Sequence, residues 1–150
     1  MPPRRRRPES LAQLVTDGSL ETVEPDPDAA RNELEMARRH IDSVAALTTT
    51  DPTLAYAGLY DAARKAISAH MRRHGYRASG GLGKHMKTMS YARIALADRG
   101  IDDALEALDD MRETRHASEY DAAPVGRAVV EHDLAHARAI VDAVAAELGA

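Results

Sequence analysis

The sequence has 150 residues, which suits one domain with a single hydrophobic core and is too short for several such domains. It has no Phe, Trp or Cys, a composition that favours closely packed helices over sandwiches and barrels rich in aromatic and β-branched residues. The net charge is −4, and four consecutive arginines at residues 4–7 contribute +4, so the rest of the chain carries −8. This acidity excludes a protein that binds nucleic acid over its whole surface.

The composition also bears on the compartment. No apolar run approaches the roughly 20 residues that a membrane-spanning helix needs. The basic first residues are not followed by the apolar stretch of a signal peptide. Because the absence of cysteine is typical of a reducing compartment, we expect a soluble, cytoplasmic protein with no membrane segment.

Residues 1–27 are predicted to be a basic arm, a short helix and a linker. The first eight residues combine three prolines with four arginines and are expected to be disordered. This arm either contacts phosphates through its charge or is a solvated tail. Ser10 is expected to cap the short helix, which Gly18 would end.

Residues 28–150 are predicted to form an all-α, antiparallel bundle of about five amphipathic helices. Asp28 and Asp51 are the expected caps of the first two helices, and Gly75 is the expected stop of the second. The second helix is apolar on two sides and is therefore expected at the centre. Short loops favour an up-and-down arrangement in which neighbouring helices alternate in direction. The expected ranges are 29–47, 52–74, 84–98, 102–115 or beyond, and 124–148.

An alternating bundle would gather most of the histidines at one end. Several arginines and lysines fall at the same end, so an acidic protein would carry a positive pole there. The histidines concerned are His70, His74, His85, His116, His132 and His136.

Two weak motifs concern metal and phosphate. The pairs His70/His74 and His132/His136 have the spacing of four residues that can place two imidazoles on zinc. Neither pair has a HExxH pattern or an evident third ligand, so the alternative is surface or cleft histidines, and we expect neither a metal nor a cofactor. The run GGLGKH at residues 80–85 lacks the first Gly and the hydroxyl residue of a phosphate-binding loop, which leaves at most a weak anion site.

The stretch MRETRHASEY at residues 111–120, where the fourth helix ends, has the densest run of Arg, His, Glu and Tyr side chains. If it is helical, three pairs four residues apart share faces, and an Arg, an imidazole and a phenol could point into one cleft. The alternative is an ordinary salt-bridged helix end, because Arg and His suit the negative pole of a helix C-terminus. The pairs are Arg112 with His116, Arg115 with Glu119, and His116 with Tyr120.

Two stretches, LAYAGLYDAARKAISAHMRRHGYR at residues 54–77 and MRETRHASEYD at residues 111–121, resemble the HEPN superfamily of small helical-bundle domains. The first is similar to its central helix and loop. The second is similar to its late-helix signature of Arg, a polar residue, a short spacer and His. Arg115 matches the Arg and His116 the polar residue, whereas Tyr120 stands where the His falls. The resemblance covers about residues 28–148.

The resemblance implies a homodimer whose two signatures face each other across a cleft. It also implies RNA binding or metal-independent endoribonuclease activity in a toxin-antitoxin or other defence system. In such an enzyme Arg115 would bind phosphate, His116 would transfer protons, and Tyr120 would orient or stack on the substrate. The residues expected to support the site or contact RNA are Arg112, Glu119, Arg73 and Lys84.

Because Tyr120 stands where the family signature has a His, a second function is also considered. Metal-free RNA cleavage needs a base for the ribose 2′-hydroxyl and cations for the phosphorane. A phenol, with an ordinary pKa of about 10, is a poor base in place of the signature His. The alternative function is a non-catalytic helical module that binds a nucleotidyltransferase, an antitoxin or another protein.

Overall fold

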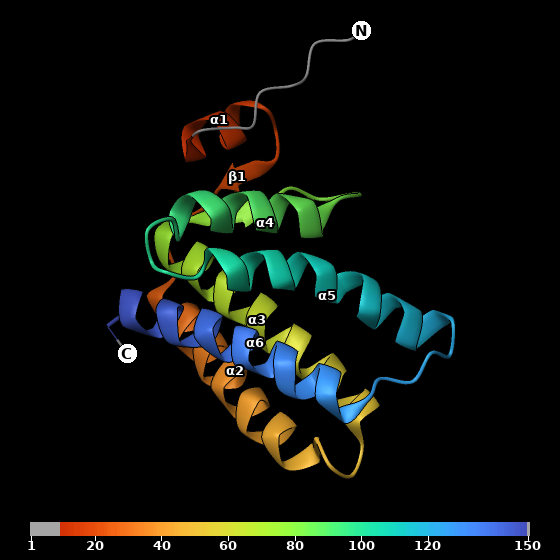
Figure 1. Ribbon diagram of the computed structural model, residues 1–150. Coiled ribbons are helices and arrows are strands. Elements are labelled where there is room, and N and C mark those ends of the chain that lie inside the picture. The colour runs from red at the N-terminus through yellow and green to blue at the C-terminus, as the bar shows by residue number, and fades with distance from the viewer. Residues whose placement is uncertain (1–9, 150) are drawn as a thin grey trace, which may run out of the picture.

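The computed structural model describes residues 10–149, and helices make up most of this range (Figure 1). The prediction of an all-α helical bundle is confirmed, and a two-stranded antiparallel sheet is added to it. The basic arm predicted at residues 1–8 lies outside the described residues. The helices are α1 (Leu11–Thr16), α2 (Pro27–Leu47), α3 (Pro52–His74), α4 (Lys84–Ala95), α5 (Asp102–Tyr120) and α6 (Arg127–Glu147), and the strands are β1 (Leu20–Thr22) and β2 (Tyr76–Ala78).

Capping residues fix most helix ends close to where the sequence places them. The side chain of Ser10 accepts a hydrogen bond from the Gln13 amide at the start of α1, and Asp51 caps α3 with Pro52 at its first position. Gly75, at φ +79°, ends α3. The expected cap of α2, Asp28, is wrong: Asp26 is the cap, because Pro27 after it is already suited to the first helical position.

The remaining helix boundaries differ by a few residues. Helix α4 ends at Ala95 rather than near residue 98, and α5 continues to Tyr120. Helix α6 begins at Arg127 rather than at Pro124, after the cap residue Gly126.

Among residues 10–149, no helix has the length and apolarity that a membrane crossing requires.

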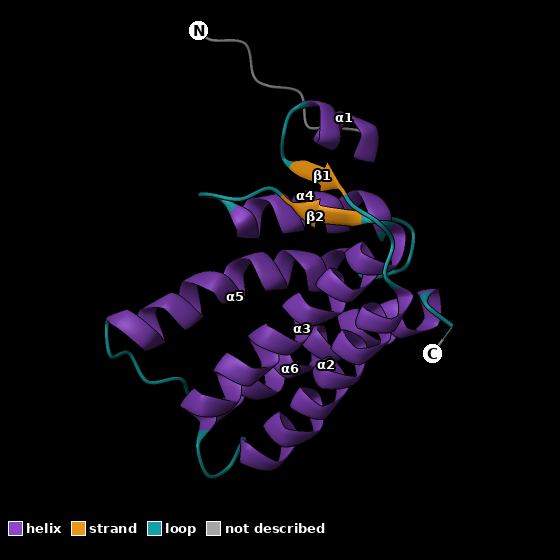
Figure 2. Cartoon of the chain, turned by 180° about the vertical axis from the view of Figure 1, so that it is seen from behind, coloured by secondary structure: helices purple, strands orange, loops and turns teal. Residues whose placement is uncertain are grey.

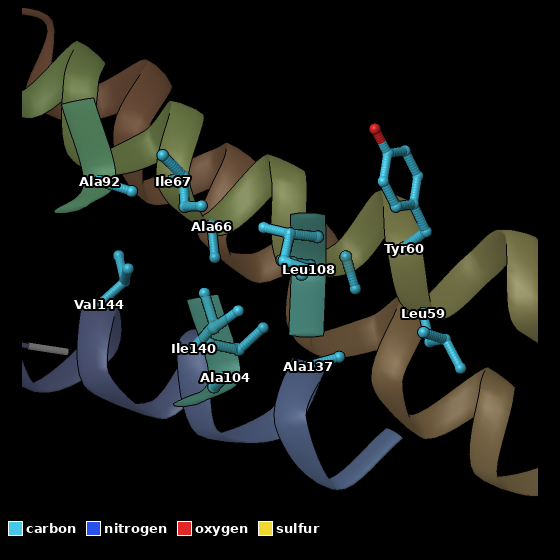
Figure 3. Close-up of a cluster of buried hydrophobic side chains, with 14 of the residues drawn as sticks. Leu59, Tyr60, Ala66, Ile67, Ala92, Ala104, Leu108, Ala137, Ile140 and Val144 are labelled. Atoms are coloured by element: carbon cyan, nitrogen blue, oxygen red, sulfur yellow. The ribbon is translucent and has the colours of Figure 1, made fainter. Parts of the chain in front are cut away.

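Helix α3 lies at the centre of the bundle, as its two apolar sides predict, with α2 on one side and α5 and α6 on another (Figure 1). Its small side chains allow neighbouring helices to approach closely, which compensates for the absence of Phe and Trp. Figure 3 shows side chains from α3, α4, α5 and α6 meeting in the core. The fully buried alanines of α3 are Ala55, Ala62, Ala63, Ala66 and Ala69.

The expected strict alternation of helix directions is wrong for α3 and α6, which run parallel. Near their starts, the Val125 amide donates to the Thr53 hydroxyl (3.2 Å). Near their ends, Nε2 of His70 lies 3.8 Å from a carboxylate oxygen of Glu147. The predicted gathering of histidines at one end therefore does not occur, because the end of α3 and the start of α6 lie at opposite ends of the bundle.

The small sheet joins two segments far apart in the sequence, and the sequence did not reveal it. Strand β1 pairs with β2 so that Leu20 lies opposite Ala78, and Figure 2 shows both strands beside α4. Leu14 and Leu20 are buried, so residues 11–22 pack onto the bundle. Three residues are too few for an alternating pattern to be recognised, and the partner strand lies more than 50 residues away.

The contact between α2 and α3 at Gly58 gives a stability prediction. A Cβ added at Gly58 would lie 2.8 Å from Cγ2 of Val44. We expect Gly58→Ala to lower the free energy of unfolding, because an overpacking cost of about 1–3 kcal/mol exceeds the helix-propensity gain of about 1 kcal/mol. Urea denaturation measures the change.

The matched control is the same substitution in a Val44→Ala background, which removes the opposing methyl groups. There Gly58→Ala should raise the free energy of unfolding by about 0.5–1 kcal/mol, since only the propensity gain remains. An equal effect in both backgrounds would show that the two side chains do not compete for this space.

Candidate functional site

The predicted cluster at the end of α5 divides between two faces of the helix. Nη1 of Arg115 lies 2.9 Å from Oε2 of Glu119, and the Arg115 Cζ lies 5.5 Å from the centre of the Tyr60 ring on α3. His116 contacts Tyr120, with ring centres 4.7 Å apart. Arg115 therefore faces α3, whereas His116 and Tyr120 are exposed, Tyr120 with 69% of its surface accessible.

The other predicted residues take different positions. Arg112 and His116 line a shallow depression of about 280 Å³. Lys84 lies at the start of α4 on the wall of a larger cavity of about 530 Å³. Arg73 is exposed in the last turn of α3 and lines neither space. The structure thus divides the α5 residues between a face toward α3 and an exposed face, and it places Lys84 on the cavity beside Tyr60.

A hydrogen-bonded chain of three side chains connects α3, α4 and α5, and sequence reasoning missed it. The Tyr60 hydroxyl lies 3.0 Å from Nδ1 of His85. Nε2 of the same imidazole lies 2.9 Å from Oδ1 of Asp109. Both ring nitrogens are therefore engaged, and Arg93 adds a contact of 3.4 Å to the other Asp109 oxygen.

The charge states of this chain follow from its surroundings. The hydrogen bond from His85, more than any other contact, lowers the pKa of Asp109, so this carboxylate is ionised and accepts the Nε2 hydrogen. Burial raises the pKa of Tyr60, so its phenol is neutral and can donate to Nδ1 of His85. With the His85 hydrogen on Nε2, Tyr60 donates to His85 and His85 donates to Asp109.

The charges of three arginines act on Tyr60, and Asp61 acts in the opposite sense. The charges of Arg64, Arg115 and Arg112 act to lower the pKa of Tyr60, against the larger effect of burial. Arg64 lies one turn after Tyr60 on α3, and its Nη2 lies 2.8 Å from Oδ1 of Asp61. A negative group placed at the phenol would meet positive charge from α3 and α5.

The cavity of about 530 Å³ opens beside this chain, and Tyr60 and His85 form part of its wall. Its other lining combines basic, acidic and apolar side chains. Two acidic residues line it, Glu24 and Asp26. The basic lining residues besides His85 are Arg64, Arg72, Arg77 and Lys84.

Three separate local features build the site. Tyr60 lies on the buried face of α3, and Figure 3 shows its hydroxyl pointing away from the labelled core side chains. His85 is the second residue of α4, directly after a turn at Gly83 with φ +83°. Asp109 lies in the middle of α5. The run GGLGKH marked the His85 turn, but no spacing in the sequence connects it with residues 60 and 109.

The structure also places the histidine pairs considered as zinc ligands. Within residues 10–149, no group of three His, Cys, Asp or Glu side chains could hold a metal ion. His132 and His136 contact each other on α6, and Nδ1 of His132 lies 2.9 Å from Oδ1 of Asp133. His70 is buried, and its Nδ1 lies 2.7 Å from the Tyr91 hydroxyl.

His70 gives a prediction about acid stability. Burial, assisted by the nearby His74, lowers the pKa of His70 from 6.5 to about 4. Between these pH values the unfolded chain binds more protons, so the free energy of unfolding should fall by up to ~1.4 kcal/mol per pH unit as the pH is lowered. Urea denaturation between pH 7 and pH 4 measures this slope.

The His70→Gln variant should show a flatter pH dependence over the same range, because the buried titrating group is gone. His132→Gln is the control, since this side chain is exposed and its loss should leave the slope unchanged. The same slope in wild type and in His70→Gln would contradict the assignment.

Comparison of the chain with protein-family models, with curated proteins and with solved structures finds no match.

Proposed function

We propose that this protein binds RNA and cleaves it without a metal ion. The observation that carries the proposal is the Asp109–His85–Tyr60 chain, which ends at a phenol whose ring contacts Arg115. Metal-free cleavage needs a proton acceptor for the 2′-hydroxyl and cations for the phosphorane, and both are present here. An imidazole is the side chain that ordinarily changes charge between pH 5 and 8.

In the proposed reaction the ribose 2′-oxygen attacks the adjacent phosphorus. Its proton passes to the Tyr60 oxygen while the Tyr60 hydrogen passes to Nδ1 of His85, and Asp109 stabilises the resulting imidazolium at Nε2. The bond between phosphorus and the 5′-oxygen breaks, and that oxygen takes a proton from water. The products are a 2′,3′-cyclic phosphate and a 5′-hydroxyl.

The cations have distinct places in this proposal. Arg115 packs against the Tyr60 ring, and Arg64 lies one turn along α3, so both guanidinium groups can contact the scissile phosphate. The exposed Tyr120 and the neighbouring Arg112 would contact flanking nucleotides. Arg73 is a peripheral cation for the RNA backbone.

The proposal keeps the setting that the HEPN resemblance implies. The protein would act in the cytoplasm as a homodimer in a toxin-antitoxin or other defence system. The exposed ends of α5 in two subunits would face each other, with His116 and Tyr120 of each lining the shared cleft. Three arginines near Tyr60, of which Arg64 is paired with Asp61 and Arg115 with Glu119, would supply positive charge for RNA on an otherwise acidic protein.

One observation favours the alternative of a non-catalytic partner module. Arg115 is ion-paired with Glu119, and His116 and Tyr120 form an exposed aromatic contact beside it. Such a pattern also suits a protein interface, where tyrosine and arginine are enriched. In that case a nucleotidyltransferase or an antitoxin would cover the end of α5.

Cleavage of labelled RNA in the presence of a chelator tests the proposal. We expect wild type to produce 2′,3′-cyclic phosphate ends and His85→Ala to lose about 10²–10⁴-fold in rate, the usual effect of removing a general base. Arg115→Ala should lose a similar factor through weaker stabilisation of the phosphorane. His132→Ala is the matched control on α6, with an exposed imidazole and an expected wild-type rate.

Intact RNA at high wild-type concentration would contradict the ribonuclease proposal for the isolated protein. Cleavage that persists in both His85→Ala and Arg115→Ala would instead remove these residues from the mechanism. Capture of a nucleotidyltransferase by wild type, lost in Tyr120→Ala, would favour the alternative.

A further inference from the structure

Helix α6 carries a second hydrogen-bonded chain, which the proposed RNA cleavage does not use. Nδ1 of His132 lies 2.9 Å from Oδ1 of Asp133, and the Tyr56 hydroxyl donates to Oδ2 of the same carboxylate over 2.6 Å. Tyr56 is buried on α3, Asp133 is partly buried, and the His132 side chain is 72% exposed. The chain therefore runs from the core of the bundle to an imidazole at its surface.

This chain determines which nitrogen of His132 is free. Burial, followed by the hydrogen bond to Asp133, raises the pKa of Tyr56, so its phenol keeps its proton and donates to the carboxylate. Because a carboxylate accepts hydrogen bonds and does not donate them, the neutral His132 ring carries its hydrogen on Nδ1. The lone pair of Nε2 is then left for a ligand outside the protein.

A second imidazole lies beside this free nitrogen. His136 is one turn after His132 on α6, and the two ring centres are 5.0 Å apart. Within residues 10–149, no hydrogen bond or ion pair engages the His136 ring. Zinc bonds to imidazole nitrogens at about 2.0–2.1 Å, so two rings that share one tetrahedral ion have centres about 5 Å apart. The observed separation agrees with such a shared ion.

The other histidine pair with this spacing lacks these properties. The ring centres of His70 and His74 are 4.4 Å apart. His70 is buried, however, and its Nδ1 lies 2.7 Å from the Tyr91 hydroxyl. Its Nε2 is buried as well. An ion from solvent therefore reaches two imidazoles at His132 and His136 but not at this pair.

We propose that His132 and His136 bind one divalent transition-metal ion, with Zn²⁺ as its representative, and that Asp133 is the positioning residue behind His132. A histidine that binds a metal almost always donates its other ring hydrogen to a carboxylate, a carbonyl or water, and Asp133 provides such a carboxylate. Imidazole nitrogens suit zinc, copper and nickel. Water completes the coordination, because residues 10–149 offer no group of three metal-binding side chains.

The inference goes beyond the proposed function, because the chain of Tyr60, His85 and Asp109 includes none of these residues. RNA cleavage is assayed in chelator, which removes any ion from α6. Zinc binding and cleavage can therefore succeed or fail separately. His132→Ala, which is expected to cleave RNA at the wild-type rate in chelator, should lose the ion.

Titration calorimetry of the full chain without an affinity tag, with zinc chloride as the ligand, tests the inference. We expect wild type to bind one Zn²⁺ per chain. Both His132→Ala and His136→Ala should weaken binding by more than about tenfold, because each removes one of two protein ligands. His74→Ala is the matched control, since it removes an exposed histidine of the other pair and should keep the wild-type dissociation constant.

The positioning role of Asp133 is tested by Asp133→Asn. An amide has one acceptor oxygen, whereas the carboxylate serves Tyr56 and His132 with two. We expect zinc to bind about tenfold more weakly, the lower end of the usual effect of losing such a partner. Nitrogen-15 NMR should also show that His132 loses its preference for the hydrogen on Nδ1. An unchanged affinity and an unchanged tautomer would contradict this role.

The same NMR measurement on wild type identifies the ligating nitrogen without any substitution. Zinc should shift the Nε2 resonance of His132, while Nδ1 keeps its hydrogen. Absence of saturable zinc binding by wild type, or coordination through Nδ1 of His132, would overturn the inference. An unchanged affinity in His132→Ala, or a loss of affinity in His74→Ala, would also overturn it, because the ion would then be bound elsewhere.

Discussion

Close packing around α3 is the constraint on which the rest of the structure depends. A chain without Phe or Trp must fill its core with Ala, Leu, Ile, Val and Met, and small side chains stabilise a core only when helix backbones approach closely. The alanine faces of α3 permit this approach, and Gly58 permits it at Val44 on α2. This packing against α3 determines how its neighbouring helices are placed.

The placement of these helices determines where the side chains of the candidate site lie. Tyr60 lies at the edge of the packed face of α3, where its ring is buried and its hydroxyl points away from the core (Figure 3). Helices α4 and α5 reach the same edge and contribute His85 and Asp109. Since each member of the chain belongs to a different helix, the geometry of the hydrogen bonds depends on the core beneath it. A change in the packing of the core would therefore also change the geometry of the site.

The sequence predicted the features that depend on interactions within one short segment of the chain. Caps such as Asp51, the stop at Gly75 and the central place of α3 follow from residue chemistry and apolar periodicity within one segment. It did not predict the parallel course of α3 and α6 or the pairing of β1 with β2, which are set by contacts between distant segments. For the same reason it pointed to the dense run on α5, including Arg115, and missed the chain through His85, whose partners come from separate helices.

Chemical rescue tests most directly the central claim, that the imidazole of His85 transfers the proton during RNA cleavage. The measurement is the cleavage rate of His85→Ala in chelator with increasing free imidazole, beside the same titration of Asp61→Ala, which removes a carboxylate next to the site but no imidazole. The account predicts that imidazole restores part of the rate only to His85→Ala. A folded His85→Ala protein that imidazole does not rescue, or one that cleaves at the wild-type rate, would contradict it.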